Sequence, residues 1–146
     1  MNLNDWLNNG WLKPHQTSKE EIRNLIKIIE RDLSDAKITD ISNDWRFAIA
    51  YNAALQICTI ALYCSGYKVS RSQSEHYRTI QSLSLTLGEE YTAIRDYLNA
   101  CRAKRNVSDY DMIGTISNTE VKELLEVASR LFDQIKIWIA GNCPDK

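Results

Sequence analysis

The stretch that decides the fold is SNDWRFAIAYNAALQICTIALYC, residues 42–64, which is apolar around most of its circumference. Ser42 and Asp44 are residue types typical of a helix N-terminus, and Gly66 stands where a helix would end. Alanines among the larger apolar residues let neighbouring helices approach closely. Since a helix that is apolar on all sides must be covered by other elements, we expect residues 42–64 to form the central helix of a bundle.

Amphipathic helices are predicted on both sides of this central segment. Hydroxyl and carboxylate residues spaced three apart, at Thr17–Glu20 and at Ser117–Glu120, are typical of capping boxes that open helices. Gly88 and Gly141 stand where helices are expected to end. With apolar residues at spacings of three and four, these signals predict flanking helices at residues 17–35, 75–87, 89–105 and 117–141.

The remaining segments are interpreted as connections, because no alternation of apolar and polar residues predicts a strand. They include a basic loop at 67–74 and a polar turn at 107–115. The fold class is therefore all-α, an antiparallel helical bundle of about five helices. Residues 1–16 are predicted to be an N-terminal arm with a short docking helix, and residues 17–146 to form the bundle.

Composition excludes several classes of protein. The chain has 146 residues, enough for one domain, and its 18 basic and 19 acidic side chains give a net charge of −1. That balance is not the footprint of a protein bound to duplex DNA. We see no leader sequence and no apolar run long enough to cross a bilayer, so the expected location is cytoplasmic, with no membrane contact.

The four cysteines are interpreted as small buried apolar residues. Cys58, Cys64, Cys101 and Cys143 form no C-x-x-C pair, and His15 and His76 lie far apart in sequence. This spacing is unlike that of a zinc site, and a disulfide is not expected in a cytoplasmic chain. We therefore predict neither a metal nor another cofactor.

A charged segment, RAKRNVSDYD at residues 102–111, interrupts the apolar pattern of the fourth predicted helix. The apolar stripe formed by Tyr91, Ile94, Leu98 and Cys101 continues to Arg105. The Arg105 guanidinium is therefore expected to point inward or into an interface, where it needs a carboxylate, a helix end or a phosphate. Residues 106–109 are rich in side chains that hydrogen-bond their own backbone and are predicted to end the helix.

Three features of the chain resemble the HEPN domain family of small helical bundles. They are the central segment WRFAIAYNAALQ at 45–56, the segment CRAKRN at 101–106 where the family has an arginine motif, and the capped final helix. The resemblance covers residues 17–139. It departs from the family at one point: no histidine follows Arg105, and Tyr110 stands near the expected place, with Asp109 and Asp111 on either side.

The resemblance implies an RNA-associated protein of a toxin–antitoxin or defence system, with two protomers pairing their motifs to cleave RNA without a metal ion. Arg105, Asn106 and Tyr110 would then be the catalytic residues. The resemblance also implies a homodimer, single-stranded RNA or tRNA as a partner, and a nucleotidyltransferase antitoxin as a further partner.

Metal-free RNA cleavage needs a base, an acid and a cation, and the sequence leaves the assignment of these roles open. Arg105 suits the cation, whereas a tyrosine hydroxyl is a poor base at neutral pH. His76 would supply the imidazole if it folds near Arg105, and Arg102 and Lys104 suit phosphate binding.

Two other interpretations also stay open: a catalytically inactive adaptor, and a structural turn in which Asp109 or Asp111 pairs with Arg105. Other aromatic residues are assigned to packing, because Trp6, Trp11, Trp45 and Trp138 are expected to make core or dimer contacts.

Overall fold

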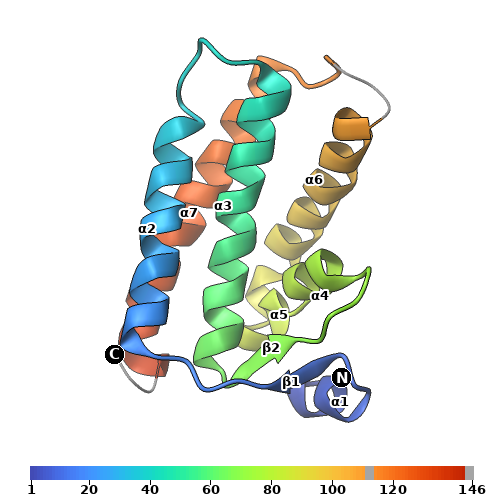
Figure 1. Cartoon of the computed structure of the whole chain (residues 1–146), viewed down its shortest axis with the longest axis vertical. Coiled ribbons are helices and arrows are strands. Elements are labelled where there is room, and N and C mark those ends of the chain that lie inside the picture. The colour runs from blue at the N-terminus through green and yellow to red at the C-terminus, as the bar shows by residue number, and fades with distance from the viewer. Residues whose placement is uncertain (111–113, 144–146) are drawn as a thin grey trace.

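Helix α3 (Asn43–Cys64) is the centre of the structure, as its composition predicts. The computed structural model of the chain describes residues 1–110 and 114–143, with side chains for all of these except 107–110. Around α3 lie the long helices α2 (Lys19–Asp35), α6 (Thr92–Tyr110) and α7 (Asn118–Asn142) (Figure 1). The all-α bundle predicted from the sequence is confirmed.

The burial of α3 explains its composition. Phe47, Tyr51, Ile57 and Ile60 are each at most 2% exposed and belong to the main hydrophobic core. By length and apolar content alone this helix is long enough to cross a membrane, so the expectation that no apolar run reaches that length is wrong. Of its most apolar window, 72% is buried by the rest of the structure, as in the core helix of a bundle.

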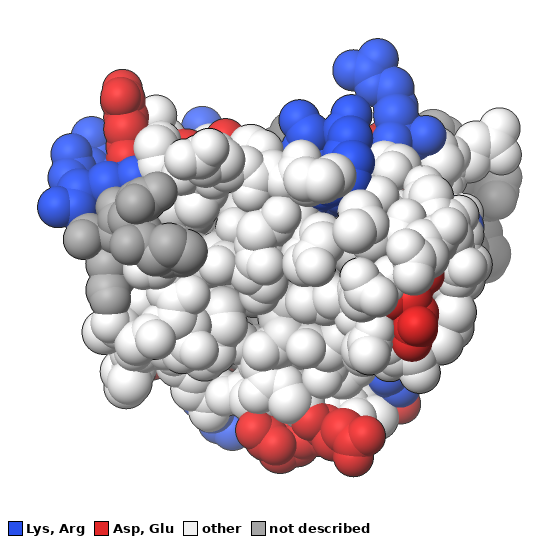
Figure 2. Space-filling model, turned by 90° about the horizontal axis from the view of Figure 1, so that it is seen from below, with Lys and Arg blue, Asp and Glu red and all other residues white. Residues whose placement is uncertain are grey.

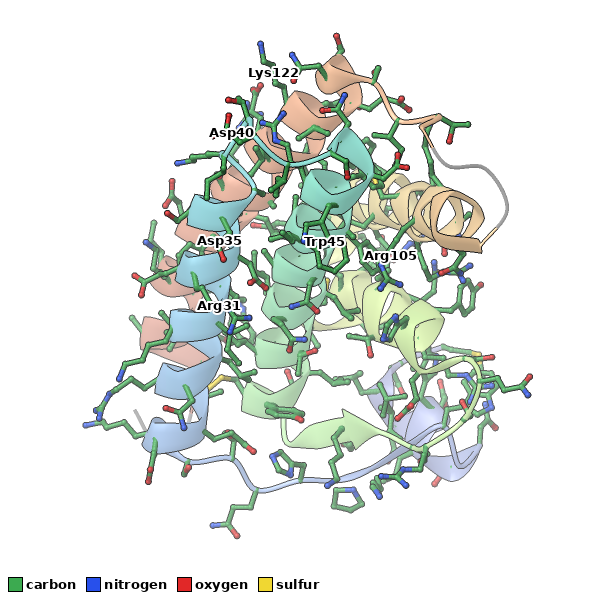
Figure 3. The ribbon with its side chains drawn as sticks, turned by 45° about the horizontal axis from the view of Figure 1, so that its top comes forward. Arg31, Asp35, Asp40, Trp45, Arg105 and Lys122 are labelled. Carbon is green, nitrogen blue, oxygen red and sulfur yellow. A yellow bond between two sulfur atoms is a disulfide. The ribbon has the colours of Figure 1, made fainter. Side chains whose placement is uncertain are left out.

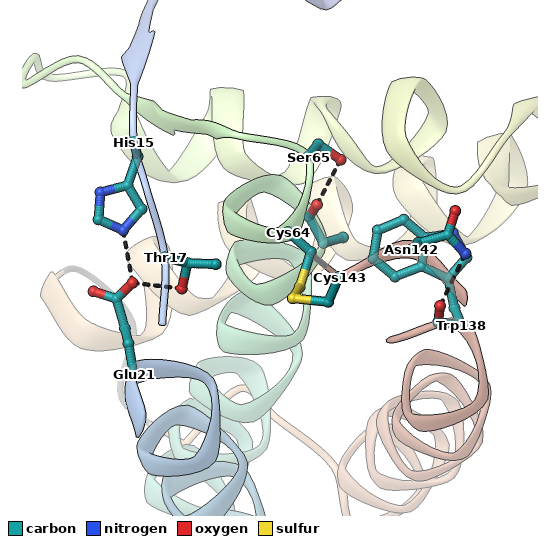
Figure 4. The surroundings of a disulfide bond; sticks show 9 residues. His15, Thr17, Glu21, Cys64, Ser65, Trp138, Asn142 and Cys143 are labelled. Atoms are coloured by element: carbon teal, nitrogen blue, oxygen red, sulfur yellow. Dashed lines mark hydrogen bonds and ion pairs between the residues drawn. A yellow bond between two sulfur atoms is a disulfide. The ribbon is translucent and has the colours of Figure 1, made fainter. Parts of the chain in front are cut away.

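Consecutive long helices run antiparallel, but α3 and α7 run parallel. Arg46, near the start of α3, contacts Asn118 at the start of α7, and Cys64 at the end of α3 is bonded to Cys143 just beyond α7 (Figures 1 and 4). Because α3 occupies the middle, it packs against α2, α6 and α7 together. The antiparallel prediction therefore holds for neighbours in sequence and not for this central pair.

Arg46 is the buried charge that fixes one end of the bundle. Its side chain is 5% exposed, and its Nε donates to the carbonyl oxygen of Ala36 at 2.9 Å. Its Nη1 donates to Asn118 Oδ1 at 3.0 Å and to Asn43 Oδ1 at 3.5 Å. One guanidinium therefore joins the end of α2 to the start of α7, and its hydrogen bonds offset the cost of burying the charge.

The N-terminal arm contains a helix, as predicted, and also a strand that was not. Helix α1 (Leu3–Asn8) buries Trp6 against Leu12 and Leu62. Strand β1 (Leu12–Pro14) then pairs antiparallel with β2 (Tyr67–Val69), with Lys13 opposite Lys68. The all-loop prediction for 67–74 is therefore wrong over 67–69, since a three-residue strand is too short to show an alternating pattern.

Several predicted helix ends are also corrected. Helix α2 is capped by Ser18, not Thr17, because the buried Thr17 hydroxyl donates to the Glu21 side chain at 2.7 Å. The third predicted helix is split at Ser82 into α4 (Glu75–Gln81) and α5 (Leu83–Thr86). Residues 89–91 form a short 3-10 turn before α6, which continues beyond Asn106 to Tyr110, and α7 passes through Gly141.

The prediction for the cysteines is only partly correct. Cys58 and Cys101 are free and buried, as expected. Cys64 and Cys143 instead form a disulfide that closes a loop of 79 residues in sequence (Figure 4). Sequence spacing gave no hint of this bond, because the parallel packing of α3 and α7 is what brings the two thiols together.

The four tryptophans do not share one environment. Trp6 is buried, and Trp138 packs partly buried against the main core. Trp45 is 60% exposed on the first turn of α3, which Figure 3 labels. The core interpretation of Trp45 is therefore wrong, and its role as a dimer contact stays a prediction.

Candidate functional site

A solvent-open cleft of about 300 Å³ lies between α4 and α6, and we call it the Arg105 cleft. Residues from α6 form one wall, and residues from α4 and the segment before it form the other. Figure 3 shows Arg105 lying between α6 and the two helices α3 and α4. The lining residues of the Arg105 cleft are Ser72, Gln73, Glu75, His76, Tyr77, Arg102, Arg105 and Asn106.

The inward direction predicted for Arg105 is confirmed. Leu98 and Cys101, two turns and one turn before it, are buried in the core, and Arg105 continues their stripe. Its guanidinium carbon lies 5.5 Å from the centre of the Tyr51 ring, within the range of a cation–π contact. The partly buried Arg105 guanidinium is therefore positioned in the cleft by Tyr51, a fully buried residue of α3.

The structure brings His76 into this same cleft. His76 comes from the first turn of α4, and its ring centre lies 6.2 Å from that of Tyr51. The Tyr51 ring is also the ring that Arg105 contacts. Partial burial and the nearby Arg105 guanidinium lower the pKa of His76 from its ordinary value of 6.5. The imidazole is therefore largely neutral at pH 7, with a free lone pair that can accept a proton.

Arg102 adds a second cation at the mouth of the Arg105 cleft. Its Nε donates to Asn99 Oδ1 at 3.1 Å, and its guanidinium carbon lies 5.4 Å from the centre of the Tyr77 ring. Tyr77 is 42% exposed, so part of this large aromatic side chain is accessible to solvent. Two arginines, an imidazole and an exposed aromatic ring thus converge on one opening.

Lys104, in contrast, does not lie in this cleft. It forms an ion pair with Glu120 on α7 and lines a separate, smaller cavity with Phe47 and Tyr97. That ion pair is the main cause of the lowered pKa of Glu120. The predicted grouping of Arg102 with Lys104 is therefore wrong, because residues two apart on a helix point in different directions.

Three further predicted residues lie at the end of α6 and just beyond it. The backbone of Asp109 and Tyr110 belongs to α6, but their side chains lie outside the described residues, as does the whole of Asp111. Asp44, another acidic residue at this end of the bundle, accepts a hydrogen bond from the Gly114 amide at 2.7 Å. Asn106 is placed, and its exposed side chain lines the cleft beside Arg105.

A second opening, of about 360 Å³, adjoins the first, and we call it the Lys68 groove. It runs between α3, α4 and the paired strands β1 and β2. Glu75 and His76 line both openings. The other lining residues of the Lys68 groove are Lys13, Leu55, Gln56, Thr59, Leu62, Tyr63, Lys68, Val69, Arg71 and Thr79.

The basic loop predicted at 67–74 contains Lys68 and Arg71, but the sequence gives no signal for Lys13 or for the groove itself. Lys13 and Lys68 are 55 positions apart in the printed sequence and become neighbours only through the register of β1 and β2. A lysine two residues after Trp11, next to a proline, carries no signal of this pairing.

These arrangements can bind anions and accept a proton. The Arg105 cleft offers two guanidinium groups for phosphate oxygens and one neutral imidazole. Comparisons of the chain with protein-family models, with curated protein sequences and with solved structures found no match.

Proposed function

We propose that this chain binds single-stranded RNA in the Arg105 cleft and cleaves it without a metal ion. The observation that supports the proposal is the meeting of His76, Arg102 and Arg105 in one open cleft. The HEPN resemblance supplies the substrate class. In this proposal His76 takes the place of the histidine that is missing after Arg105.

The chemistry assigned to these residues is transphosphorylation. Neutral His76 accepts the proton of a ribose 2′-hydroxyl, and the 2′-oxygen attacks the adjacent phosphorus. The bond from phosphorus to the 5′-oxygen breaks, and that oxygen takes a proton from solvent in the open cleft. The products are a 2′,3′-cyclic phosphate and a 5′-hydroxyl, while Arg105 and Arg102 stabilise the negative charge that develops on phosphorus-bound oxygens.

Tyr77 suits the binding of an unstacked base. Single-stranded nucleic acids bind proteins through cationic grooves that carry aromatic rings, with roughly 1–3 kcal/mol for each stacked base. The exposed Tyr77 ring lies beside Arg102, so one base and its phosphate would be held by adjacent residues. A homodimer that pairs two Arg105 clefts, and a nucleotidyltransferase partner, belong to the same proposal through the HEPN resemblance alone.

The test is incubation of the purified chain with a labelled single-stranded oligoribonucleotide in the presence of a chelator. We expect products that end in a cyclic phosphate, and no cleavage of the deoxyribonucleotide of the same sequence, which lacks the attacking hydroxyl. His76→Ala and Arg105→Ala should each reduce the rate by at least about a hundredfold, in line with the loss of a general base or of charge stabilisation.

Matched controls separate chemistry from folding. His15→Gln removes the other histidine, which hydrogen-bonds Glu21 and lies outside the cleft, and Arg23→Ala removes an exposed arginine of α2. Both should cleave as the unmodified chain does. Binding of RNA without cleavage would leave the inactive-adaptor function, and a rate unchanged in His76→Ala would refute the role of His76.

A further inference from the structure

The Lys68 groove carries three cations that the proposed cleavage site does not use. Lys13 and Lys68 stand directly opposite each other across the β1–β2 ladder, and Arg71 follows two residues after β2. Within the part of the chain that the structure describes, none of these three side chains forms an ion pair or a hydrogen bond. Lys68 acts electrostatically on Glu21, whose pKa it helps to lower, and no direct contact in the described chain occupies any of the three side chains.

The placement of Lys13 opposite Lys68 is unfavourable without an anion. Like charges directly across a ladder repel each other, because their Cβ atoms lie only about 5 Å apart. An anion bound between the two ammonium groups would turn this repulsion into attraction. Figure 2 views the molecule from the end where β1 and β2 lie. Lys and Arg side chains stand in two groups along its upper edge, the left one beside an acidic side chain, and further acidic side chains lie at the right and along the lower edge.

The walls of the Lys68 groove suit a nucleotide better than a bare ion. Gln56 and Thr59 of α3 add an amide and a hydroxyl, and Tyr63 adds an aromatic ring. Glu75 is the one carboxylate among the described lining residues, so three cations face a single acidic group. A volume of about 360 Å³ lies at the lower end of the range for small-ligand sites.

The Lys68 groove and the Arg105 cleft are joined at the start of α4. Glu75 and His76 line both, so that His76 has Arg102 and Arg105 on one side and Lys68 and Arg71 on the other. The phosphates of a nucleic-acid strand that passes His76 would therefore lie near cations on both sides of this residue. No other pair of cavities described for this chain shares a histidine.

We propose that an RNA strand with its reacting phosphodiester at His76 continues into the Lys68 groove, where Lys13, Lys68 and Arg71 neutralise its neighbouring phosphates. This inference rests on the proposed function and adds a substrate requirement to it. The substrate is a strand of several nucleotides that bends around the start of α4, and a dinucleotide fills only the Arg105 cleft.

The experiment measures binding of 2′-O-methyl RNA, which lacks the attacking hydroxyl, as a function of salt concentration. The test variant is Lys13→Ala/Lys68→Ala/Arg71→Ala, and the matched control is Lys27→Ala/Lys122→Ala/Arg23→Ala, which removes the same three charges from exposed positions on α2 and α7. Each single-strand phosphate contact contributes about 0.7 to the slope of log K against log salt.

We expect the test variant to bind an octanucleotide at least about tenfold more weakly than the control, with a slope smaller by about 2. Both variants should bind a dinucleotide equally. Arg71→Ala alone, which leaves the strand pairing untouched, should lower the octanucleotide slope by about 0.7. If the triple variant does not fold, the salt slope of Arg71→Ala still tests whether the strand contacts the Lys68 groove.

Two failures can be told apart. If the unmodified chain cleaves RNA but the test variant and the control bind the octanucleotide with equal affinity and slope, the strand path is refuted and the proposed function stands. If the unmodified chain neither binds nor cleaves RNA, the proposed function is refuted, and the strand path with it. Equal binding of inorganic phosphate and of the octanucleotide would also refute the strand path, because the groove would then hold an isolated anion.

Discussion

The guanidinium carbon of Arg105 lies 5.5 Å from the centre of the Tyr51 ring, so a buried residue of the central helix positions the cation of the candidate site. Tyr51 is 1% exposed, and its hydroxyl has no hydrogen-bond partner among the described residues. Burial raises the pKa of this hydroxyl, which therefore stays protonated at neutral pH. The ring, and not the hydroxyl, is what supports Arg105.

Two substitutions of Tyr51 test this division. Tyr51→Phe keeps the ring and removes an unpaired polar group, so its free energy of unfolding should change by less than about 1 kcal/mol. Tyr51→Leu removes the ring, and we expect a loss of about 1–3 kcal/mol together with weaker RNA binding. Urea unfolding and oligonucleotide titration measure the two effects. A Phe variant destabilised as much as the Leu variant would show that the hydroxyl matters.

The pH dependence of cleavage should report on His76. As a general base the imidazole works in its neutral form, and its pKa is lowered from 6.5 by partial burial and by Arg105. The rate should therefore rise with pH, with a midpoint below 6.5, and level off above it. Arg105→Gln removes one cause of the shift and should move the midpoint upward. A midpoint above 6.5 in the unmodified chain would contradict this prediction.

Arg102 and Lys104 should differ in their effects on RNA. Arg102→Ala removes a cation from the Arg105 cleft and should weaken oligonucleotide binding several-fold, with a smaller salt slope. Lys104→Ala breaks only the partly exposed ion pair with Glu120, so it should leave binding unchanged and cost less than about 1 kcal/mol of stability. Equal losses of binding in the two variants would contradict the proposal that RNA binds in the Arg105 cleft, which Lys104 does not line.

Arg46 should be among the most important polar residues for stability. Arg46→Met removes the donor to Ala36 O and to Asn118 Oδ1 and leaves the buried Ala36 carbonyl unpaired, and we expect a loss of about 3 kcal/mol. The comparison is Arg31→Ala, whose arginine side chain is 62% exposed and pairs with Asp32, and which should cost less. Denaturant unfolding of both variants and of Asn118→Ala measures the loss in the free energy of unfolding. A loss for Arg46→Met no larger than the loss for Arg31→Ala would refute the prediction.

Thiol counting tests the disulfide. Burial raises the pKa of Cys58 to about 12 and that of Cys101 to about 11, so neither thiol should react in the folded protein at pH 8. Denaturation without reductant should expose two reactive thiols, and denaturation with reductant four. Since the bond closes a 79-residue loop, Cys143→Ser should lower stability by up to roughly 4 kcal/mol. Four thiols without reductant would contradict the Cys64–Cys143 bond.

Elements with a long, strong periodic signal could be predicted from the sequence. The central helix, the capping box at Ser117 and the inward direction of Arg105 follow from local composition and spacing, because a helix fixes which residues share a face. Short elements could not be predicted in the same way. The strands β1 and β2 have three residues each, and the break at Ser82 depends on its buried hydroxyl, which donates to the Thr79 carbonyl at 2.7 Å.

The candidate site shows the same division. The sequence placed Arg102 and Arg105 on one helix with Asn106 directly at its predicted end, and grouped the three because residues three and four apart lie on one face. It could only offer His76 as a conditional partner, because nothing local says which helix packs against α6.

The sequence by itself determined the all-α class, the central position of α3 and the direction of Arg105, because these depend on residues within one helix. Only the tertiary structure decided that His76 faces Arg105, that Lys13 stands opposite Lys68, and that Cys64 meets Cys143. The physical reason is that each of these pairs joins separate elements. Their distances are set by how α3 packs against all its neighbours at once, which is a property of the whole chain.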